Sequence, residues 1–333
     1  MSRAGSARCA AAILVYHSVA DVEHDPFGIT VAPDHFRGHM EVLARRFTPL
    51  SLEQLCDGLD RGELPERSVV VTFDDGYANN LSAALPSLAA AGVPASLFVA
   101  TGYVGSEREF WWDEVQRLVG GGAGADRPPV LELTATGQTL RCPMGDGATA
   151  AKQIALWLQG RPSGSVEEAL AQLHQWAGIG GNLAPRETHR PLTLDELREL
   201  AGSDRLEIGA HTRHHLRLGA QTAGVQHDEI AGSRADLERW LGAAPAAFAY
   251  PFGNPGSDYS PATVAAVAEI GFARAVSGGP GLTGRSSPRY ELPRWFVTTP
   301  APADFERWLA NRFRPAALRA VGKLSRMARR AGR

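Results

Sequence analysis

The sequence predicts an α/β protein in which parallel strands alternate with helices. A β-branched apolar run at residues 69–73 ends abruptly in two carboxylates and a glycine, Asp74-Asp75-Gly76. A second short apolar segment, at residues 206–210, also ends in polar residues, here three histidines within five positions. Helical and strand-like segments alternate around both in a β-α-β rhythm. Because such folds place their chemistry at the carboxyl ends of the strands, we expect the two motifs to lie on one face.

Length and composition indicate one catalytic domain with embellishments. The 333 residues are 44% hydrophobic, enough for a large core, and barrels of this size commonly form a single domain. The last 22 residues carry eight of the 34 basic side chains and no acidic ones, so the remainder has 26 basic against 36 acidic side chains. A net acidic body argues against nucleic acid as a partner. The cysteines Cys9, Cys56 and Cys142 are few and widely spaced, which favours a reducing compartment.

Residues 10–16 are predicted to form the first strand, which His17 follows. The segment superficially resembles a short signal peptide, but its apolar run is at the lower limit for one, and no small-x-small cleavage site follows it. No run in the sequence approaches the roughly 18 apolar residues that a membrane-spanning helix needs. We therefore expect a cytoplasmic protein.

The next elements follow from apolar spacing and from capping signals. Residues 33–47 carry apolar side chains at helical spacing, which predicts an amphipathic helix. Ser51 begins a second helix, because it forms a capping box with Gln54. The strand at 69–73 is then followed by a predicted helix at 81–91, closed by Gly92, and a strand at 94–99.

Residues 105–190 break this rhythm and are predicted to be an inserted α+β segment on the catalytic face. They contain a glycine-rich patch at 120–125, a hairpin around 136–138, and two helices at 148–159 and 166–177. Trp111 and Trp112 stand beside acidic residues near its start, and indole rings often stack on sugar faces. We assign a substrate contact to Trp112. The alternative is that the two tryptophans anchor the insertion to the rest of the fold.

The α/β rhythm resumes after the insertion. Thr193 opens a helix with a second capping box, and Ser260-Pro261 caps a later helix that stops at Gly271. The remaining predicted elements are a helix at 221–241 and strands at 206–210, 248–250, 272–276 and 295–297.

The two polar strand ends predict a metal site. Adjacent aspartates on an extended backbone point to opposite sides, so Asp74 and Asp75 are expected to have different roles. His211 and His215 are four residues apart, which lets both rings converge on one ion if the segment curls into a helical turn. One carboxylate and two imidazoles suit Zn²⁺, with Co²⁺, Ni²⁺ or Fe²⁺ as alternatives. The competing interpretation is a surface Asp-Asp-Gly turn and a set of polar surface histidines.

Together these motifs resemble the polysaccharide deacetylase family, which includes chitin and peptidoglycan deacetylases. Thr72-Phe73-Asp74-Asp75-Gly76 and His211-Thr212-x-x-His215 carry the resemblance, and residues 248–253, Phe-Ala-Tyr-Pro-Phe-Gly, are similar to a third family segment. The resemblance covers roughly residues 10–300. It implies a distorted (β/α) barrel of about seven strands. It also implies a divalent metal held by Asp75, His211 and His215, with Asp74 as the catalytic base.

Two departures from the family pattern affect the residues around the base. Ala249 stands where the family has Arg, and Arg294 stands where the family has the His that protonates the leaving group. Arg294, at the end of the last strand, can hold Asp74 ionised in place of the missing Arg. His17 becomes the candidate acid because it ends the first strand on the same face, and a structural role at the strand end is the alternative. His214 is a weaker candidate.

Tyr250 and Phe252 are expected beside the acyl group. Phe252 replaces a family tyrosine whose backbone N–H binds the oxyanion, and any residue except proline provides that donor. The predicted activity is hydrolysis of an acetyl or other small acyl group from an N-acylated sugar or glycan precursor, nucleotide-linked and lipid-linked forms included. A non-catalytic glycan-binding protein, a sugar O-acetyl esterase and a deformylase are the alternatives.

Residues 301–333 form the predicted C-terminal tail. Five of its basic side chains fall in one sector of a helical wheel, with apolar ones opposite: Arg319, Lys323, Arg326, Arg330 and Arg333. A basic amphipathic helix starting near Pro315 favours peripheral contact with an anionic membrane surface, such as the inner face of the cell membrane. The alternative is a solvated terminus lying on the acidic body.

Overall fold

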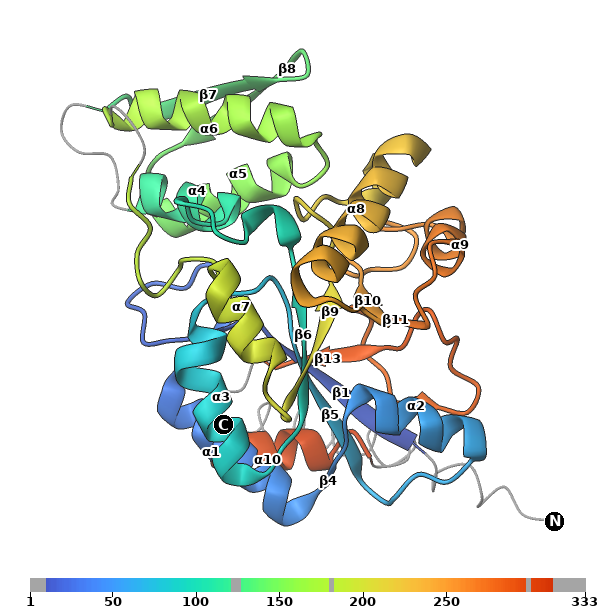
Figure 1. The fold of residues 1–333 in the computed structure, drawn as a ribbon. Coiled ribbons are helices and arrows are strands. Elements are labelled where there is room, and N and C mark those ends of the chain that lie inside the picture. The colour runs from blue at the N-terminus through green and yellow to red at the C-terminus, as the bar shows by residue number, and fades with distance from the viewer. Residues whose placement is uncertain (1–9, 121–126, 180–182, 298–300, 314–333) are drawn as a thin grey trace, which may run out of the picture.

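Helices and parallel strands alternate along the chain in the computed structural model, which describes residues 10–120, 127–179, 183–297 and 301–313 (Figure 1). The strands are β1 (Ala10–Tyr16), β2 (Ser18–Val19), β3 (Thr30–Val31), β4 (Thr48–Pro49), β5 (Ser68–Phe73), β6 (Ala95–Val99), β7 (Val130–Ala135), β8 (Gln138–Pro143), β9 (Leu206–Ala210), β10 (Ala247–Ala249), β11 (Arg274–Val276), β12 (Thr283–Gly284) and β13 (Arg294–Phe296). The helices are α1 (Pro33–Arg46), α2 (Leu52–Arg61), α3 (Leu85–Ala91), α4 (Trp111–Gly120), α5 (Gly147–Leu158), α6 (Ser163–Ala177), α7 (Leu194–Ala201), α8 (Ala223–Leu241), α9 (Pro261–Glu269) and α10 (Pro302–Ala310).

The central sheet is a nearly closed barrel. Within the described ranges, seven of its strands run parallel in the order β11-β10-β9-β6-β5-β1-β13. The chain between β12 and β13 returns to β11, where the Leu292 N–H donates to the Ala275 carbonyl and the Ser277 N–H donates to the Leu292 carbonyl. These bonds bring the two edges of the sheet together. The predicted distorted (β/α) barrel of about seven strands is confirmed.

The register of the strands places the polar motifs at one end of the barrel. β1 and β5 are almost fully buried apolar strands, and Tyr16 pairs with Phe73 at their carboxyl ends. His17 and Asp74 therefore follow their strands side by side, and the Asp74 N–H donates to the Tyr16 carbonyl over 3.0 Å. β9 enters the same sheet beside β6, and the His211 N–H donates to the Val99 carbonyl over 2.9 Å.

The predicted helix caps are confirmed. The Ser51 and Thr193 side chains accept hydrogen bonds from the backbone N–H groups of Gln54 and Glu196, and both capping boxes are complete. Gly92 ends α3 in the left-handed conformation, which glycine adopts without strain. Sequence reasoning missed the helices α4 and α10. It also missed short strands such as β4 and β12, because two residues carry no periodicity.

The insertion forms a small unit with its own apolar core. Its hairpin, β7 and β8, and its two following helices, α5 and α6, lie where the sequence predicts them. Buried apolar side chains from these elements and from α4 pack together, among them Val115, Leu133, Ile154 and Leu170. Figure 1 shows the insertion grouped at one end of the barrel, with α4 and α5 closest to the strands.

The C-terminal region is described as far as residue 313. α10 lies against α1, and the Phe305 ring stacks on the buried His39 ring with centroids 4.1 Å apart. The predicted basic helix from Pro315 onward lies outside the described residues. In the part of the chain that the structure describes, every helix is too short or too polar to cross a bilayer.

Candidate active site

Asp75, His211 and His215 converge at the carboxyl end of the barrel. Asp75 Oδ1 lies 3.7 Å from His211 Nε2 and 3.5 Å from His215 Nε2. One ligand atom from each of the three residues falls within 4.8 Å of the others, and all three side chains are buried. The structure thus brings together the three residues for which a metal-binding role is predicted.

The donor set fits a divalent transition metal. Asp75 Oδ1 is buried and makes no hydrogen bond to any described residue, a costly state for a carboxylate that faces no cation. Burial, followed by the charge of Asp74, raises the pKa of Asp75 well above its usual range, and a bound cation would reverse that. His211 Nδ1 donates to the Ala249 carbonyl over 2.8 Å, which leaves its Nε2 lone pair facing Asp75.

Left-handed backbone turns produce this convergence. Asp75 has φ of 73°, Thr212 of 62° and His215 of 53°, values that non-glycine residues adopt rarely. The expected helical turn between His211 and His215 is therefore wrong, since two left-handed residues turn the chain there instead. Asp74 and Asp75 were also expected to point to opposite sides because they continue a strand. That reason is wrong, since β5 ends at Phe73 and Asp75 adopts a left-handed conformation.

Aromatic rings hold the His215 imidazole in place. The Trp112 ring lies 4.6 Å from it and the Phe252 ring 4.7 Å, centroid to centroid. The Trp112 indole N–H donates to the Tyr77 hydroxyl over 2.8 Å, and that hydroxyl donates to Asp113 over 2.7 Å. Trp112 lines the cavity described below but is only 7% exposed, so it anchors the insertion to the site as well. Its substrate contact stays a prediction.

Asp74 is held by Arg294 in a buried bidentate ion pair. Arg294 Nη1 and Nη2 donate to the two Asp74 oxygens over 2.6 and 2.7 Å, and Nε donates to the Ser277 carbonyl over 3.0 Å. Thr72 Oγ1 accepts a further bond from Nη1 over 3.2 Å. Burial alone would raise the pKa of Asp74, but the guanidinium outweighs it and holds that pKa well below its usual range. Arg294 therefore contacts Asp74, but its predicted position at the end of the last strand is wrong, because it is the first residue of β13.

Replacing Arg294 with Met is expected to destabilise the protein by about 3–5 kcal/mol near pH 7, because Asp74 would remain as an unpaired buried charge. In the parent, the lowered pKa of Asp74 contributes stability that is present above the unfolded pKa and lost as pH falls through the folded pKa. In the variant the guanidinium no longer opposes burial, so the folded pKa of Asp74 is higher than in the parent, and the destabilisation shrinks as pH falls and Asp74 becomes protonated. Denaturant unfolding at several pH values measures both effects.

Arg289→Met is the matched control for this experiment. Arg289 forms an ion pair with Asp60 over 2.6 Å, but both side chains are more than half exposed. Losing such a pair changes stability by roughly 0–1 kcal/mol. An Arg294→Met cost no larger than that of Arg289→Met would show that the buried pair does not hold Asp74 ionised.

His17 lies beside Asp74 at the end of β1 and lines the same cavity as the metal-site residues. Its Nδ1 is buried without a hydrogen-bond partner among the described residues, and its ring lies 5.3 Å from that of Phe296. Burial lowers the pKa of His17 to about 4, with Arg294 and His211 acting in the same direction and Asp74 opposing them. His214 instead bonds Glu229 over 2.6 Å, and it is absent from the described cavity lining.

Phe252 and Tyr250 lie in the third predicted segment. Phe252 has φ of 61°, and its backbone N–H donates to no acceptor in the described ranges. Tyr250 differs, because its N–H donates to the Val276 carbonyl within the sheet. The buried Tyr250 ring stacks on Tyr259 with centroids 3.9 Å apart, and its hydroxyl has no described partner. Of the two backbone donors, that of Phe252 is available to a ligand.

A cavity of about 380 Å³ joins these residues. It is lined by both barrel and insertion: Val15, His17, Phe27, Ile29, Asp74, Asp75, Trp111, Trp112, Ala155, Gln159, His211, His215, Arg217, Tyr250, Phe252, Asn254, Asp258, Gly278, Arg294 and Phe296. Sequence reasoning missed Arg217, Gln159 and Asp258. Arg217 follows His215 by two positions, and that proximity was the available signal for it.

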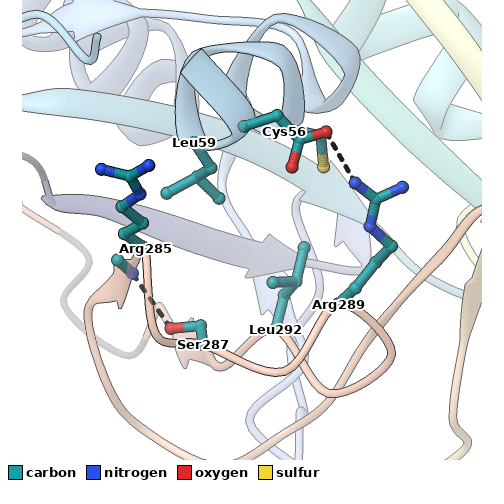
Figure 2. Close-up of a pocket in the computed structure, with 8 residues that line it drawn as sticks. Cys56, Leu59, Arg285, Ser287, Arg289 and Leu292 are labelled. Carbon is teal, nitrogen blue, oxygen red and sulfur yellow. Dashed lines mark hydrogen bonds and ion pairs between the residues drawn. The ribbon is translucent and has the colours of Figure 1, made fainter. Parts of the chain in front are cut away.

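A second cavity, of about 250 Å³, lies away from these residues and is drawn in Figure 2. Gly284 lines it and pairs with Ala10 at the amino end of β1, whereas His17 follows the carboxyl end. Figure 2 shows Arg285 and Arg289 on opposite sides of this cavity, with Ser287 between them. Asp60 already neutralises Arg289. Because it lies near the amino end of β1, this second cavity is separate from the metal-site residues.

Comparison with known proteins relates these features to a family. A family model described as polysaccharide deacetylase matches residues 61–124 and 172–275, together about half of the chain. Among curated proteins, the putative polysaccharide deacetylase YxkH of Bacillus subtilis (strain 168) is 26% identical over 129 residues. That match covers 38% of this chain and 45% of the relative, so the chain spans less than half the length of that relative.

Two solved structures share the fold along most of the chain. The Streptococcus pyogenes deacetylase PplD in complex with acetate aligns with a TM-score of 0.59 at 18% identity, covering 92% of this chain and 100% of that one. IcaB from Ammonifex degensii aligns with a TM-score of 0.58 at 17% identity, covering 90% and 97%. At such identities the likeness concerns the fold alone.

Proposed function

The chain belongs to the polysaccharide deacetylase family, and from that premise we propose that it is a metal-dependent hydrolase removing an acetyl or other small acyl group from an N-acylated sugar. The observation that carries the proposal is the pairing of two unlike aspartates. Asp75 faces two imidazole nitrogens with a free oxygen, while its neighbour Asp74 is kept ionised by Arg294. A site built only to bind a glycan has no need of both.

The roles of the residues follow from their surroundings. Asp75, His211 and His215 would hold one divalent ion, most simply Zn²⁺, and burial keeps both imidazoles neutral by lowering their pKa. When bound, such an ion makes a water molecule nucleophilic at neutral pH and polarises the acyl carbonyl. Asp74 accepts a proton from the attacking water. Arg294 keeps Asp74 ionised and fixes the orientation of its carboxylate.

Two further groups complete the proposed reaction. The Phe252 N–H donates to the oxygen that becomes negative as the carbonyl is attacked, and one such donor stabilises the transition state by roughly 3 kcal/mol. His17 donates a proton to the departing nitrogen, so that an amine and a carboxylate are released. Burial lowers the pKa of His17 and so disfavours its protonated form, whereas Asp74 favours that form. A negative oxygen forming in the same cavity would add to the effect of Asp74.

The proposed substrates are N-acyl sugars or glycan precursors, including nucleotide-linked and lipid-linked ones. The two described cysteines, Cys56 and Cys142, are free thiols, which supports a reducing, cytoplasmic site of action. The basic side chains of the tail sequence support contact with an anionic membrane, where lipid-linked sugars occur.

Purified full-length protein is expected to release free acid from at least one class of N-acyl sugar. The test is a panel of simple, nucleotide-linked and lipid-linked N-acetyl and N-formyl sugars, with sugar O-acetates as a third acyl class. Free acetate and formate are measured before and after chelation. Release from O-acetates alone would identify an esterase, and no chelator-sensitive release from any member would reject the proposed function.

A further inference from the structure

We propose that the active-site cavity accepts one N-acyl sugar at a time. That sugar is free, stands at the end of a glycan chain, or is linked on one side to a nucleotide or a lipid. Sugars in the interior of a polymer would be excluded. The inference rests on the proposed function, since it names the substrate class of that site. It depends on three features of the cavity: its walls, its rim and its volume.

The walls of the cavity come from both the insertion and the barrel. Trp112 of α4 and Ala155 of α5 line it from the insertion. Phe27, from the loop before β3, and Phe296, at the end of β13, contribute from the barrel. A sugar within a polymer has neighbours on both sides and needs an open groove running through the site. Here the insertion lies at one end of the barrel (Figure 1), and its residues Trp111, Trp112, Ala155 and Gln159 line the cavity.

The insertion is tied to the barrel at the rim of the cavity. Arg217 Nη2 donates to Gln159 Oε1, at the end of α5, over 2.7 Å. Arg217 Nε faces Asp258 Oδ1 at 3.1 Å, and Asp258 is only 2% exposed. Asp258 in turn accepts hydrogen bonds from the Asn254 backbone and side chain over 2.9 and 2.6 Å. A buried carboxylate thus anchors the bridging arginine, which makes this wall a fixed part of the site.

The volume of the cavity suits one sugar. Ligand pockets of about 300–1,000 Å³ bury most of a drug-sized molecule. This cavity measures about 380 Å³, near the lower end of that range. It therefore has room for one sugar ring with its acyl group, but not for a row of rings. Substituents beyond the first sugar would lie outside the cavity and contribute little to binding.

The test uses N-acetylglucosamine oligomers of increasing length with the full-length protein. Binding is measured by calorimetry on the metal-loaded Asp74→Asn variant, and products of the parent enzyme are sequenced by mass spectrometry. We expect affinity to change by less than about threefold beyond the single sugar, and acetate to be lost from a terminal sugar only. A gain of about tenfold or more with length, or loss of acetate from interior sugars, would overturn the inference.

A pair of variants tests the rim directly. Gln159→Ala removes the bridge to Arg217 and is expected to raise the turnover of the hexamer relative to the dimer severalfold. Gln175→Ala, on the exposed side of α6, is the control and should leave that ratio unchanged. A ratio unchanged in Gln159→Ala would contradict the proposed wall. An affinity that does not change with oligomer length, without acetate release from any oligomer, would reject the proposed hydrolysis. It would still agree with a cavity that accepts one sugar.

Discussion

Replacing His17 with Ala is expected to slow cleavage of an N-acyl sugar by about 10²- to 10⁴-fold, the usual contribution of one acid-base group. Hydrolysis of an activated acetyl ester should be largely spared. The reason is the leaving group: an amine departs only when it gains a proton, whereas an activated phenolate departs without one. His17 is the histidine that lines the cavity beside Asp74 without being a candidate metal ligand.

His214→Ala is the matched control for the His17 experiment. His214 is bonded to Glu229 and lies outside the described cavity lining, so its removal should affect both substrates little. An equal loss on amide and ester in His17→Ala would mean that His17 supports the shape of the site and transfers no proton. Selective loss on the amide in His214→Ala would instead assign proton donation to that residue.

The barrel and the placement of its polar motifs were predictable from sequence because both depend on local patterns. Buried β-branched runs such as β5 identify parallel strands, and their register then places His17 and Asp74 at one end. The contact between Arg294 and Asp74 could also be predicted from the sequence. In a closed barrel the first and last strands are neighbours, and β1 lies between β5 and β13, so an arginine on the last strand can reach the acid that follows β5. The sequence misplaced Arg294 only along its strand, because it stands at the amino end of β13.

The detailed shape of the site was not predictable in the same way. The left-handed residues Thr212 and His215 have no neighbouring glycine to signal a turn, and the surrounding structure imposes their conformation. The bridge from Arg217 to Gln159 joins residues 58 positions apart, across an insertion whose orientation no local pattern specifies. Tyr77 directly follows the Asp-Asp-Gly motif, but its hydroxyl acts on His215 only through the Trp112 ring.

The adjacent aspartates provide the second large effect. Asp75→Ala removes the only carboxylate of the proposed metal set and should leave the protein without its ion. Asp74→Asn keeps that set intact and should retain the metal. It replaces the proposed base with an amide that cannot accept a proton, so acetate release should fall by roughly 10²- to 10⁴-fold.

The account is tested most directly by elemental analysis of these two variants and the parent, with acetate release measured on the same samples. We expect about one divalent ion per chain in the parent and in Asp74→Asn, and little in Asp75→Ala, with both variants inactive. Circular dichroism would verify that each variant is folded. Metal retained by folded Asp75→Ala, or lost from Asp74→Asn, would contradict the assignment of one aspartate to the metal and its neighbour to the proton.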